Sequence, residues 1–249
     1  MSGIAAVFDR TGAGPDPDRL HQMVSAMEHR GPDGSGEWSN DIVGIGHQQL
    51  VTTPQGTVDD QPYTHDGLAV ASDARLDNRP ELLRRLGLTD VSRTVPDSHL
   101  LLEAYREWGD GCVNELIGAF AFVVWDSSKK TLFCARDHFG VKPLYYHITD
   151  DVFAVASEPK SLLTLPGFTP SLDESRVGDF LLGRLEDKTN SFYESVRRLP
   201  CPSDHERIPE RLLAFGVPDH IAGTLGVGLP GFGHRRVFAV PLGIQRKPQ

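Results

Sequence analysis

Short apolar runs and longer amphipathic segments alternate along the first 165 residues of the chain. The runs are bounded by turn residues and are too short for ordinary helices, so they predict buried strands. Between two of them, a Gly- and Pro-rich cluster at 30–36 predicts a loop. The strands expected from these runs cover residues 4–8, 42–50 and 68–72.

The amphipathic segments predict helices, of which the one at 97–108 has the clearest pattern. Leu101, Ala104 and Trp108 fall on one face of this segment, as a helix packed on a core requires. Asp97 is placed to cap its first turn, and Gly109 to end it. The other three expected helices cover residues 20–27, 80–86 and 159–165.

Four apolar segments in the middle of the chain form two predicted hairpins. The first joins residues 119–125 to 132–135 through a polar turn, and the second joins 144–148 to 152–156. Strands joined by such short turns pair antiparallel. Together with the helices, they predict a mixed α/β domain that contains at least one antiparallel sheet.

Composition narrows the possible functions. Apolar residues make up 39% of the chain and charged residues 24%, as in a globular protein rather than a disordered one. The formal net charge of -9 argues against a nucleic-acid partner and against binding to an anionic membrane surface. No segment resembles a secretory signal or approaches the length of a membrane span, so the sequence predicts a cytoplasmic protein.

Neither a metal site nor a disulfide framework is expected. The three cysteines, Cys112, Cys134 and Cys201, are widely spaced and match no disulfide or zinc pattern. His47 and His138 have no second ligand at a recognisable spacing, so each is expected to be structural. No metal and no cofactor are therefore predicted for this chain.

Eight sequence motifs follow one another along the chain. They are MSGIAAVF at 1–8, HRGPDGSGEW at 29–38, IGHQQL at 45–50, DARLDNRPEL at 73–82, PDSHLLLEAYREWG at 96–109, GAFAFVVWD at 118–126, ARDHFGVKPLYY at 135–146 and SEPKSLL at 157–163. In this order and spacing they resemble the N-terminal glutaminase domain of asparagine synthetases, a class II glutamine amidotransferase domain. The resemblance covers about residues 1–200.

The resemblance implies a fold and a mechanism. The fold is α+β, a four-layer αββα sandwich of the N-terminal-nucleophile hydrolase type, here formed by residues 1–165. In that family, loss of the initiator methionine exposes a cysteine nucleophile whose own α-amino group serves as the base. An Asn side chain and a Gly backbone N–H form the oxyanion hole. An Arg and an Asp hold the α-carboxylate and α-ammonium groups of glutamine, and the ammonia passes to an ATP-dependent synthetase domain.

The nucleophile position holds Ser2 where the family has Cys. Ser2 is small enough for Met1 to be removed, and N-terminal Ser serves as the nucleophile in other enzymes of this fold type. A hydroxyl, however, is almost wholly un-ionised at neutral pH, whereas a thiol is partly thiolate and intrinsically more nucleophilic. Ser2 is therefore expected to be a plain N-terminal residue rather than a working nucleophile.

The oxyanion position holds Asp73 and Ala74 where the family has Asn-Gly. A carboxylate cannot donate a hydrogen bond, and losing one oxyanion donor typically costs roughly 3–4 kcal/mol of barrier. A negative charge about 4 Å from the developing oxyanion would add repulsion. Asp73 would avoid that repulsion only by taking up a proton or by turning away.

Substrate anchoring depends on three further positions. Gln49 stands where the family has the Arg that pairs with the α-carboxylate, and a neutral amide cannot replace that charge. Asp97 matches the ammonium-binding Asp, although its expected role as a helix cap needs no substrate. Arg30, in the loop that would line the pocket wall, is expected to pair with Asp33 or another carboxylate.

The segment Asp-Ala-Arg-Leu-Asp-Asn-Arg at 73–79 resembles a degenerate subset of the family that includes β-lactam synthetases and lasso-peptide cyclases. Members of this subset keep the glutaminase fold as a scaffold and form amide bonds without ammonia. The pyrophosphate loop of the synthetase half, Ser-Gly-Gly-x-Asp-Ser, has no counterpart in residues 165–249. Residues 166–200 are accordingly expected to begin a linker toward a missing synthetase domain.

Beyond residue 200 the composition changes. Residues 201–249 hold six Pro and seven Gly and show no amphipathic period, which predicts a flexible or disordered tail. The likeness to the family stops at the same place. A frameshift or a gene truncation is therefore one hypothesis for the origin of this tail.

Three interpretations of the function stay open. The first is an asparagine-synthetase-like glutamine amidotransferase domain with an inactive glutaminase, acting as a scaffold or as a truncated remnant of an enzyme of asparagine biosynthesis. The second is an active glutamine-hydrolysing fragment that uses Ser2. The third is a module that binds an amino acid or peptide through Asp97. The expected partners are glutamine, a second copy of the chain or a separate synthetase.

Overall fold

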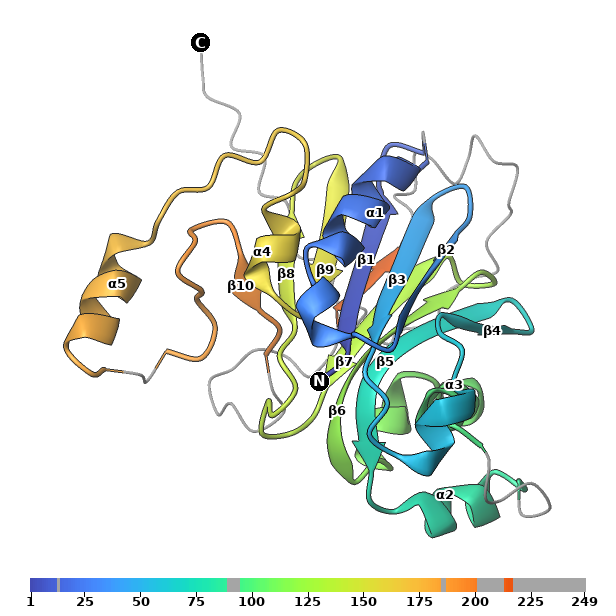
Figure 1. Ribbon diagram of the computed structural model, residues 1–249. Helices are drawn as coiled ribbons and strands as arrows, with labels where there is room; N and C mark the ends of the chain where they lie inside the picture. The colour runs from blue at the N-terminus through green and yellow to red at the C-terminus, as the bar shows by residue number, and fades with distance from the viewer. Residues whose placement is uncertain (13, 89–94, 185–186, 201–212, 217–249) are drawn as a thin grey trace, which may run out of the picture.

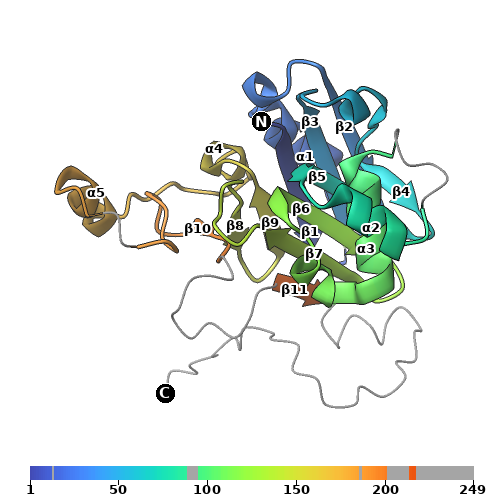
Figure 2. The ribbon, with the colours of Figure 1, turned by 90° about the horizontal axis from the view of Figure 1, so that it is seen from below.

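Two antiparallel sheets packed face to face form the centre of the molecule (Figures 1 and 2). The computed structural model describes residues 1–12, 14–88, 95–184, 187–200 and 213–216. Sheet A has six strands in the order β10-β8-β9-β1-β3-β2. They are β1 (Gly3–Asp9), β2 (Gly34–Ser39), β3 (Val43–Gln49), β8 (Tyr145–Ile148), β9 (Val152–Ala156) and β10 (Arg197–Arg198).

The position of β1 in sheet A decides where the N-terminus lies. β1 is buried along its whole length and pairs antiparallel with β3 on one side and with β9 on the other. Such continuous burial explains why its sequence is an unbroken apolar run rather than an alternating one. Ser2 directly precedes β1, which is an inner strand. The N-terminus therefore lies at the end of an inner strand and not at an edge strand of the sheet.

Sheet B has five strands in the order β11-β7-β6-β5-β4. β5 and β6 pair over nine residues, from Leu68 opposite Asp126 to Leu76 opposite Gly118. The strands of this sheet are β4 (Tyr63–His65), β5 (Leu68–Leu76), β6 (Gly118–Asp126), β7 (Thr131–Arg136) and β11 (Leu213–Gly216).

Helices cover the outer face of each sheet. Helices α1 (Pro17–Ser25) and α4 (Pro159–Leu162) pack on sheet A, whereas α2 (Arg79–Arg85) and α3 (Asp97–Trp108) pack on sheet B. The inner faces of the sheets meet in a third core, where the rings of Phe8 and Trp125 lie 5.9 Å apart. These layers form the predicted four-layer αββα sandwich, so the α+β fold class is confirmed.

Two predicted boundaries in the pocket region are wrong. Residues 30–36 are not all loop, because a 3₁₀ helix, η1 (Glu28–Arg30), precedes Gly31 and β2 begins at Gly34. β2 forms despite its glycines because each of its residues pairs with β3, and tertiary pairing overrides a weak local preference. β5 runs four residues beyond its predicted end at Ser72. Asp73 and Ala74 are therefore strand residues.

The segment at 166–200, predicted to begin a linker toward a synthetase domain, carries regular secondary structure. It contains α5 (Glu174–Leu181), and β10 extends sheet A by pairing with β8. Within the tail, β11 pairs antiparallel with β7. The prediction of a flexible or frameshifted tail otherwise falls on residues outside the described part of the chain.

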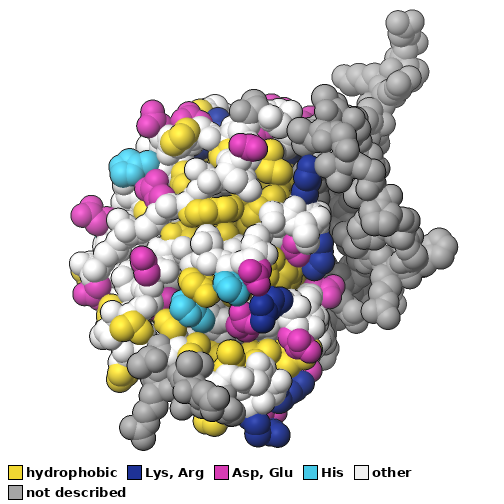
Figure 3. All heavy atoms as spheres, turned by 90° about the vertical axis from the view of Figure 1, so that its right-hand side faces the viewer, with side chains coloured by type: hydrophobic (Ala, Val, Ile, Leu, Met, Phe, Trp, Pro, Cys, Tyr) yellow, Lys and Arg dark blue, Asp and Glu magenta, His cyan; other side chains and the backbone are white. Residues whose placement is uncertain are grey.

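Within the described ranges, no helix is both long and apolar enough to cross a bilayer. On the face in Figure 3, acidic and basic side chains are interspersed with apolar and neutral ones. That face therefore carries no large patch of a single charge.

The core between sheet B and α3 gives a direct stability prediction. Phe122 is fully buried, and its ring lies 5.8 Å from those of both Phe120 and Phe133. Phe122→Ala should lower the free energy of unfolding by about 3–5 kcal/mol, because it removes buried contacts and leaves a cavity. Urea unfolding measures the change. Phe139→Ala is the control: Phe139 is 86% exposed, and an equal loss there would contradict this assignment of the core.

Candidate functional site

A cavity of about 300 Å³ opens at one end of the sandwich, between the ends of the two sheets. Sheet A contributes Ser2 and Gln49 to its lining, and sheet B contributes Asp73 and Ala74. The cavity wall is completed by residues from α3, from the loop after β7, and from the 3₁₀ helix η2 (Pro54–Val58) and the loop that follows it. These include Asp59, Gln61, Asp97, Val141 and Lys142.

Ser2 is held by the backbone around it. It is 8% exposed, and its Oγ accepts a hydrogen bond from the backbone N–H of Leu50 at 3.1 Å. Its carbonyl oxygen accepts a second bond, of 3.0 Å, from Nε of Arg30. Ser2 thus lies in the cavity at the nucleophile position implied by the family resemblance, with Met1 in the lining beside it.

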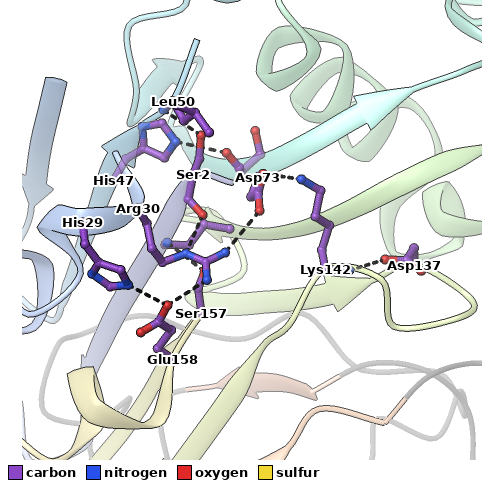
Figure 4. Close-up of polar contacts among 12 residues, drawn as sticks. Ser2, His29, Arg30, His47, Leu50, Asp73, Asp137, Lys142, Ser157 and Glu158 are labelled. Atoms are coloured by element: carbon purple, nitrogen blue, oxygen red, sulfur yellow. Dashed lines mark hydrogen bonds and ion pairs between the residues drawn. The ribbon is translucent and has the colours of Figure 1, made fainter. Parts of the chain in front are cut away.

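Arg30 lies behind Ser2 and connects it to two acids (Figure 4). Its Nη1 lies 2.9 Å from Oε1 of Glu158 and its Nη2 lies 3.7 Å from Oδ2 of Asp73. Of the two alternatives left by the sequence, another carboxylate is therefore correct. Asp33 instead accepts a hydrogen bond from the backbone N–H of Val51.

The glycine after Arg30 is required by close packing. A Cβ atom on Gly31 would lie 2.3 Å from the carbonyl carbon of Gln48 and 2.4 Å from the backbone nitrogen of Gln49. Real Cβ atoms do not approach backbone this closely, so only glycine lets η1 lie directly on β3. This contact keeps Arg30 under the N-terminus.

Asp73 has two cationic neighbours, which the sequence did not reveal. It is 5% exposed, and its Oδ1 lies 2.7 Å from Nζ of Lys142 while Oδ2 faces Arg30 (Figure 4). The expectation that Asp73 must either take up a proton or turn away is therefore incomplete. Two cations neutralise a carboxylate that would otherwise be a buried, uncompensated charge.

A tight turn places Lys142 against Asp73. The carboxylate of Asp137 accepts hydrogen bonds from the backbone N–H groups of Phe139, Val141 and Lys142 at 2.9–3.1 Å. This turn fixes the chain direction just before Lys142. Lys142 was not among the candidate residues predicted from the sequence, although the motif ARDHFGVKPLYY contains it.

The side-chain amide of Gln49 donates its hydrogen bonds to the protein backbone and not to the space of the cavity. Its Nε2 donates to the carbonyl oxygens of Gly56 and Asp59, at 3.0 and 2.7 Å. Both amide hydrogens are therefore used to hold η2 and the residue that follows it. A glutamine α-carboxylate at this position would meet neither a cation nor an unused donor.

Asp97 is engaged in a different way from the one predicted. The N-cap of α3 is Pro96, and no side chain caps the helix, so the capping prediction is wrong. Instead, one oxygen of Asp97 accepts the backbone N–H of Leu76 at 3.0 Å, and the other forms an ion pair with Arg79. The carboxylate joins α3 to the end of β5 and to α2. Burial raises its pKa despite these two partners.

Asp59 and His47, which also line the cavity, are paired as well. Asp59 accepts hydrogen bonds from Ser98 Oγ at 2.5 Å and from Gln61 Nε2 at 2.9 Å, and burial raises its pKa. His47 is bonded to the backbone carbonyl of Ser72 at 3.1 Å, and burial lowers its pKa to about 4. His47 is therefore neutral near pH 7, with Nε2–H as the donor. Within the described ranges, no cluster of His, Cys, Asp and Glu is arranged to hold a metal.

The six residues singled out from the sequence lie at one end of the molecule. Five of them line the cavity: Ser2, Gln49, Asp73, Ala74 and Asp97. Arg30 lies behind it, in contact with Ser2 and Asp73. Most of these polar side chains are bonded to other groups of the protein.

Comparison with known proteins identifies the family. A model of the glutamine amidotransferase domain matches residues 1–208. The chain belongs to this family. It is 31% identical over 186 residues to asparagine synthetase [glutamine-hydrolyzing] 3 of Bacillus subtilis, a match that covers 72% of this chain and 30% of the relative. It is 30% identical over 185 residues to the putative asparagine synthetase 2 of Methanocaldococcus jannaschii, covering 66% of this chain and 35% of the relative.

Not all relatives of this glutamine amidotransferase domain are called synthetases. Amidase chry2 of Gibberella zeae is 31% identical over 180 residues, covering 66% of this chain and 26% of that protein. The chain thus spans about a third or less of the length of these curated relatives.

Solved structures support the fold of the domain. The glutamine phosphoribosylpyrophosphate amidotransferase of B. subtilis superimposes with a TM-score of 0.52 at 20% identity, over 64% of this chain and 42% of that one. A second structure, an allosteric regulatory enzyme of purine biosynthesis, gives a TM-score of 0.55 at 19% identity, over 65% and 43%. Both similarities confirm the N-terminal-nucleophile type of sandwich.

The ion pair at Asp73 gives the first prediction for the site. Asp73→Asn should lower the free energy of unfolding by about 3 kcal/mol, because it leaves the ammonium of Lys142 without a counter-ion in a buried position. The double variant Asp73→Asn/Lys142→Met should recover part of that loss. Chemical denaturation measures both. Arg75→Ala, which breaks the exposed pair with Asp77, is the control and should change stability by less than about 1 kcal/mol. An equally small effect of Asp73→Asn would contradict the assignment.

His47 gives a pH prediction. The pKa of His47 is about 4 in the folded chain against 6.5 for an unperturbed histidine, so between these values the unfolded chain binds more protons. Stability should therefore rise with pH across this window, by about 3 kcal/mol from His47 alone. The raised pKa values of Asp59 and Asp97 act in the opposite direction, so the relevant quantity is the difference between wild type and His47→Gln. If the two show parallel pH profiles of unfolding between pH 4 and 6.5, His47 is not the group responsible.

Proposed function

We propose that this glutamine amidotransferase domain has lost glutaminase activity and serves as a scaffold for an amide-forming, asparagine-synthetase-like enzyme. The observation that supports this most strongly is the ion pair between Asp73 and Lys142 at the oxyanion position. A donor amide is expected there in an active site of this kind. The carboxylate in its place is buried, ionically paired and unable to donate.

The expected loss of glutaminase rate can be estimated separately for the oxyanion position and for the nucleophile position. Loss of one oxyanion donor lowers kcat by a factor of roughly 10²–10³. The two cations beside Asp73 reduce the charge repulsion expected from the sequence, so this second penalty is smaller than for an isolated carboxylate. Replacement of the cysteine thiol by the Ser2 hydroxyl lowers the nucleophile's reactivity further. These losses act on the same step and together remove most of the acceleration.

Substrate binding is weakened independently of the chemistry. At Gln49 the α-carboxylate of glutamine would lose a charge-assisted contact, because the amide hydrogens already bind two backbone carbonyls. At Asp97 the α-ammonium would have to compete with the ion pair to Arg79. Both ends of the substrate therefore meet groups that already have partners.

One observation favours a second function, that of a binding module. The cavity has not collapsed, and a volume of about 300 Å³ is enough for a small polar ligand. Isothermal titration with glutamine distinguishes this function from the first. Saturable heat without glutamate release would favour a binding module, whereas no heat favours a scaffold whose cavity is a remnant.

The proposed loss of activity is tested by glutamate release. The purified chain, mixed with millimolar glutamine, should produce glutamate no faster than its Ser2→Ala variant, in an assay coupled to glutamate dehydrogenase. The B. subtilis asparagine synthetase [glutamine-hydrolyzing] 3 is the positive control. Intact-mass measurement establishes whether Met1 has been removed. Turnover by the wild type that disappears in Ser2→Ala would reject the proposal and establish catalysis by an N-terminal serine.

A further inference from the structure

One carboxylate of the cavity lining has no cationic partner among the residues that the structure describes. Asp59 accepts hydrogen bonds from two neutral groups, the hydroxyl of Ser98 and the side-chain amide of Gln61. The charged groups that act on it are the carboxylates of Asp97 and Asp60, and these like charges, together with burial, raise its pKa. A cation bound at Asp59 would relieve this unfavourable accumulation of negative charge.

A second acceptor in the cavity wall is also incomplete. Asp73 is 5% exposed and lines the cavity, yet its Oδ2 accepts no hydrogen bond from the described residues. Nη2 of Arg30 faces this oxygen at 3.7 Å, which is too long for a hydrogen bond (Figure 4). Buried polar atoms are normally bonded, so the vacant acceptor indicates that a donor enters from the cavity.

The positively charged side chains of the described lining are already used. Lys142 is paired with Asp73 at 2.7 Å. Arg75 is 71% exposed and is bonded to Asp77. The amide hydrogens of Gln49 are donated to backbone carbonyls. A ligand carboxylate would therefore meet an acidic wall without a side-chain cation that is free to bind it.

We propose that the cavity binds a small organic ammonium ion that carries no carboxylate. The ammonium group of the ligand donates to Asp59. A further N–H donor of the ligand, such as that of a primary amide, bonds to Oδ2 of Asp73. The carbon chain contacts the apolar lining, which includes Leu50, Ala119 and Val141. This inference rests on the binding function proposed for the cavity and specifies the class of ligand.

The proposed ligand differs from glutamine by a single group. Glutamine without its α-carboxylate is γ-aminobutyramide, and glutamine without its α-ammonium group is glutaramate. The first compound keeps both kinds of donor that the cavity can accept. The second brings a negative charge into a wall that contains the carboxylates of Asp59, Asp73 and Asp97. Because the three compounds are similar in size, their order of affinity measures the charge preference of the cavity.

Isothermal titration at neutral pH, in a buffer without amines, tests this order. The wild-type chain should bind γ-aminobutyramide at least tenfold more tightly than glutamine, and glutaramate should give no saturable heat. The proposal is overturned if γ-aminobutyramide does not bind, or if glutamine or glutaramate binds as tightly.

The role of Asp59 is tested by Asp59→Asn, which removes the charge and keeps the size of the side chain. This variant should bind γ-aminobutyramide at least tenfold more weakly than wild type, with circular dichroism to show that it is folded. Asp66→Asn is the matched control, because the side chain of Asp66 is 65% exposed in the turn between β4 and β5. It should bind like wild type. Unchanged binding by Asp59→Asn would reject Asp59 as the ammonium site and overturn the proposal.

Gln49→Arg supplies a readout that a folding defect would not produce. It places a cation in the cavity wall, and arginine is suited to bind a carboxylate. Glutamine and glutaramate should therefore bind at least tenfold more tightly than they do to wild type, whereas γ-aminobutyramide should bind more weakly. An order of affinity that stays as in wild type would show that charge does not select the ligand.

Glutamate release separates this inference from the proposed loss of activity. If the chain hydrolyses glutamine and still prefers γ-aminobutyramide, the loss of activity is rejected and the ammonium site stands. If the chain is inactive and binds glutamine more tightly, the ammonium site is rejected and the loss of activity stands. If an inactive chain binds none of the three compounds, the ammonium site and the binding function are both rejected, and the scaffold function stands.

Discussion

A carboxylate buried between two sheets must be neutralised, and much of the pocket is organised around this requirement. Asp73 is 5% exposed, and an unpaired charge there would cost several kcal/mol. Lys142 approaches it from the loop after β7, and Arg30 from η1. Because Arg30 also holds the carbonyl of Ser2 and the carboxylate of Glu158, the same set of charges fixes the N-terminus, the end of β5 and the start of α4.

The other groups expected to contact a substrate are likewise bonded to partners within the protein. Gln49 holds the backbone of η2, and Asp97 joins α3 to β5 and Arg79. An enzyme pocket usually keeps unsatisfied donors and charges that the substrate completes, at a cost in stability. Here most of these groups are satisfied internally. Such a pocket stabilises the fold without a ligand, which agrees with a domain kept for its shape.

The fold was largely predictable from the sequence, because the apolar runs and helical periodicities reflect burial directly. The sequence predicted which positions form the site, but it did not predict the hydrogen-bond and ion-pair partners of their side chains. Lys142 lies 69 residues from Asp73 in the chain, and no local pattern reveals that pairing. The helix-capping prediction for Asp97 failed because Pro96 takes the cap position and Arg79 takes the carboxylate. In both cases a charged partner distant in sequence, Lys142 for Asp73 and Arg79 for Asp97, determines where the carboxylate is engaged.

The central claim is the proposal that this domain has lost glutaminase activity, so that Ser2 does not serve as a nucleophile. Intact-mass spectrometry tests this most directly, after incubation of the purified chain with an electrophilic diazoketone analogue of glutamine. Such an analogue traps a competent nucleophile irreversibly, however slow the normal turnover. The account predicts an unchanged mass, the same as for Ser2→Ala. A stoichiometric adduct that maps to Ser2 and is missing in the variant would contradict it.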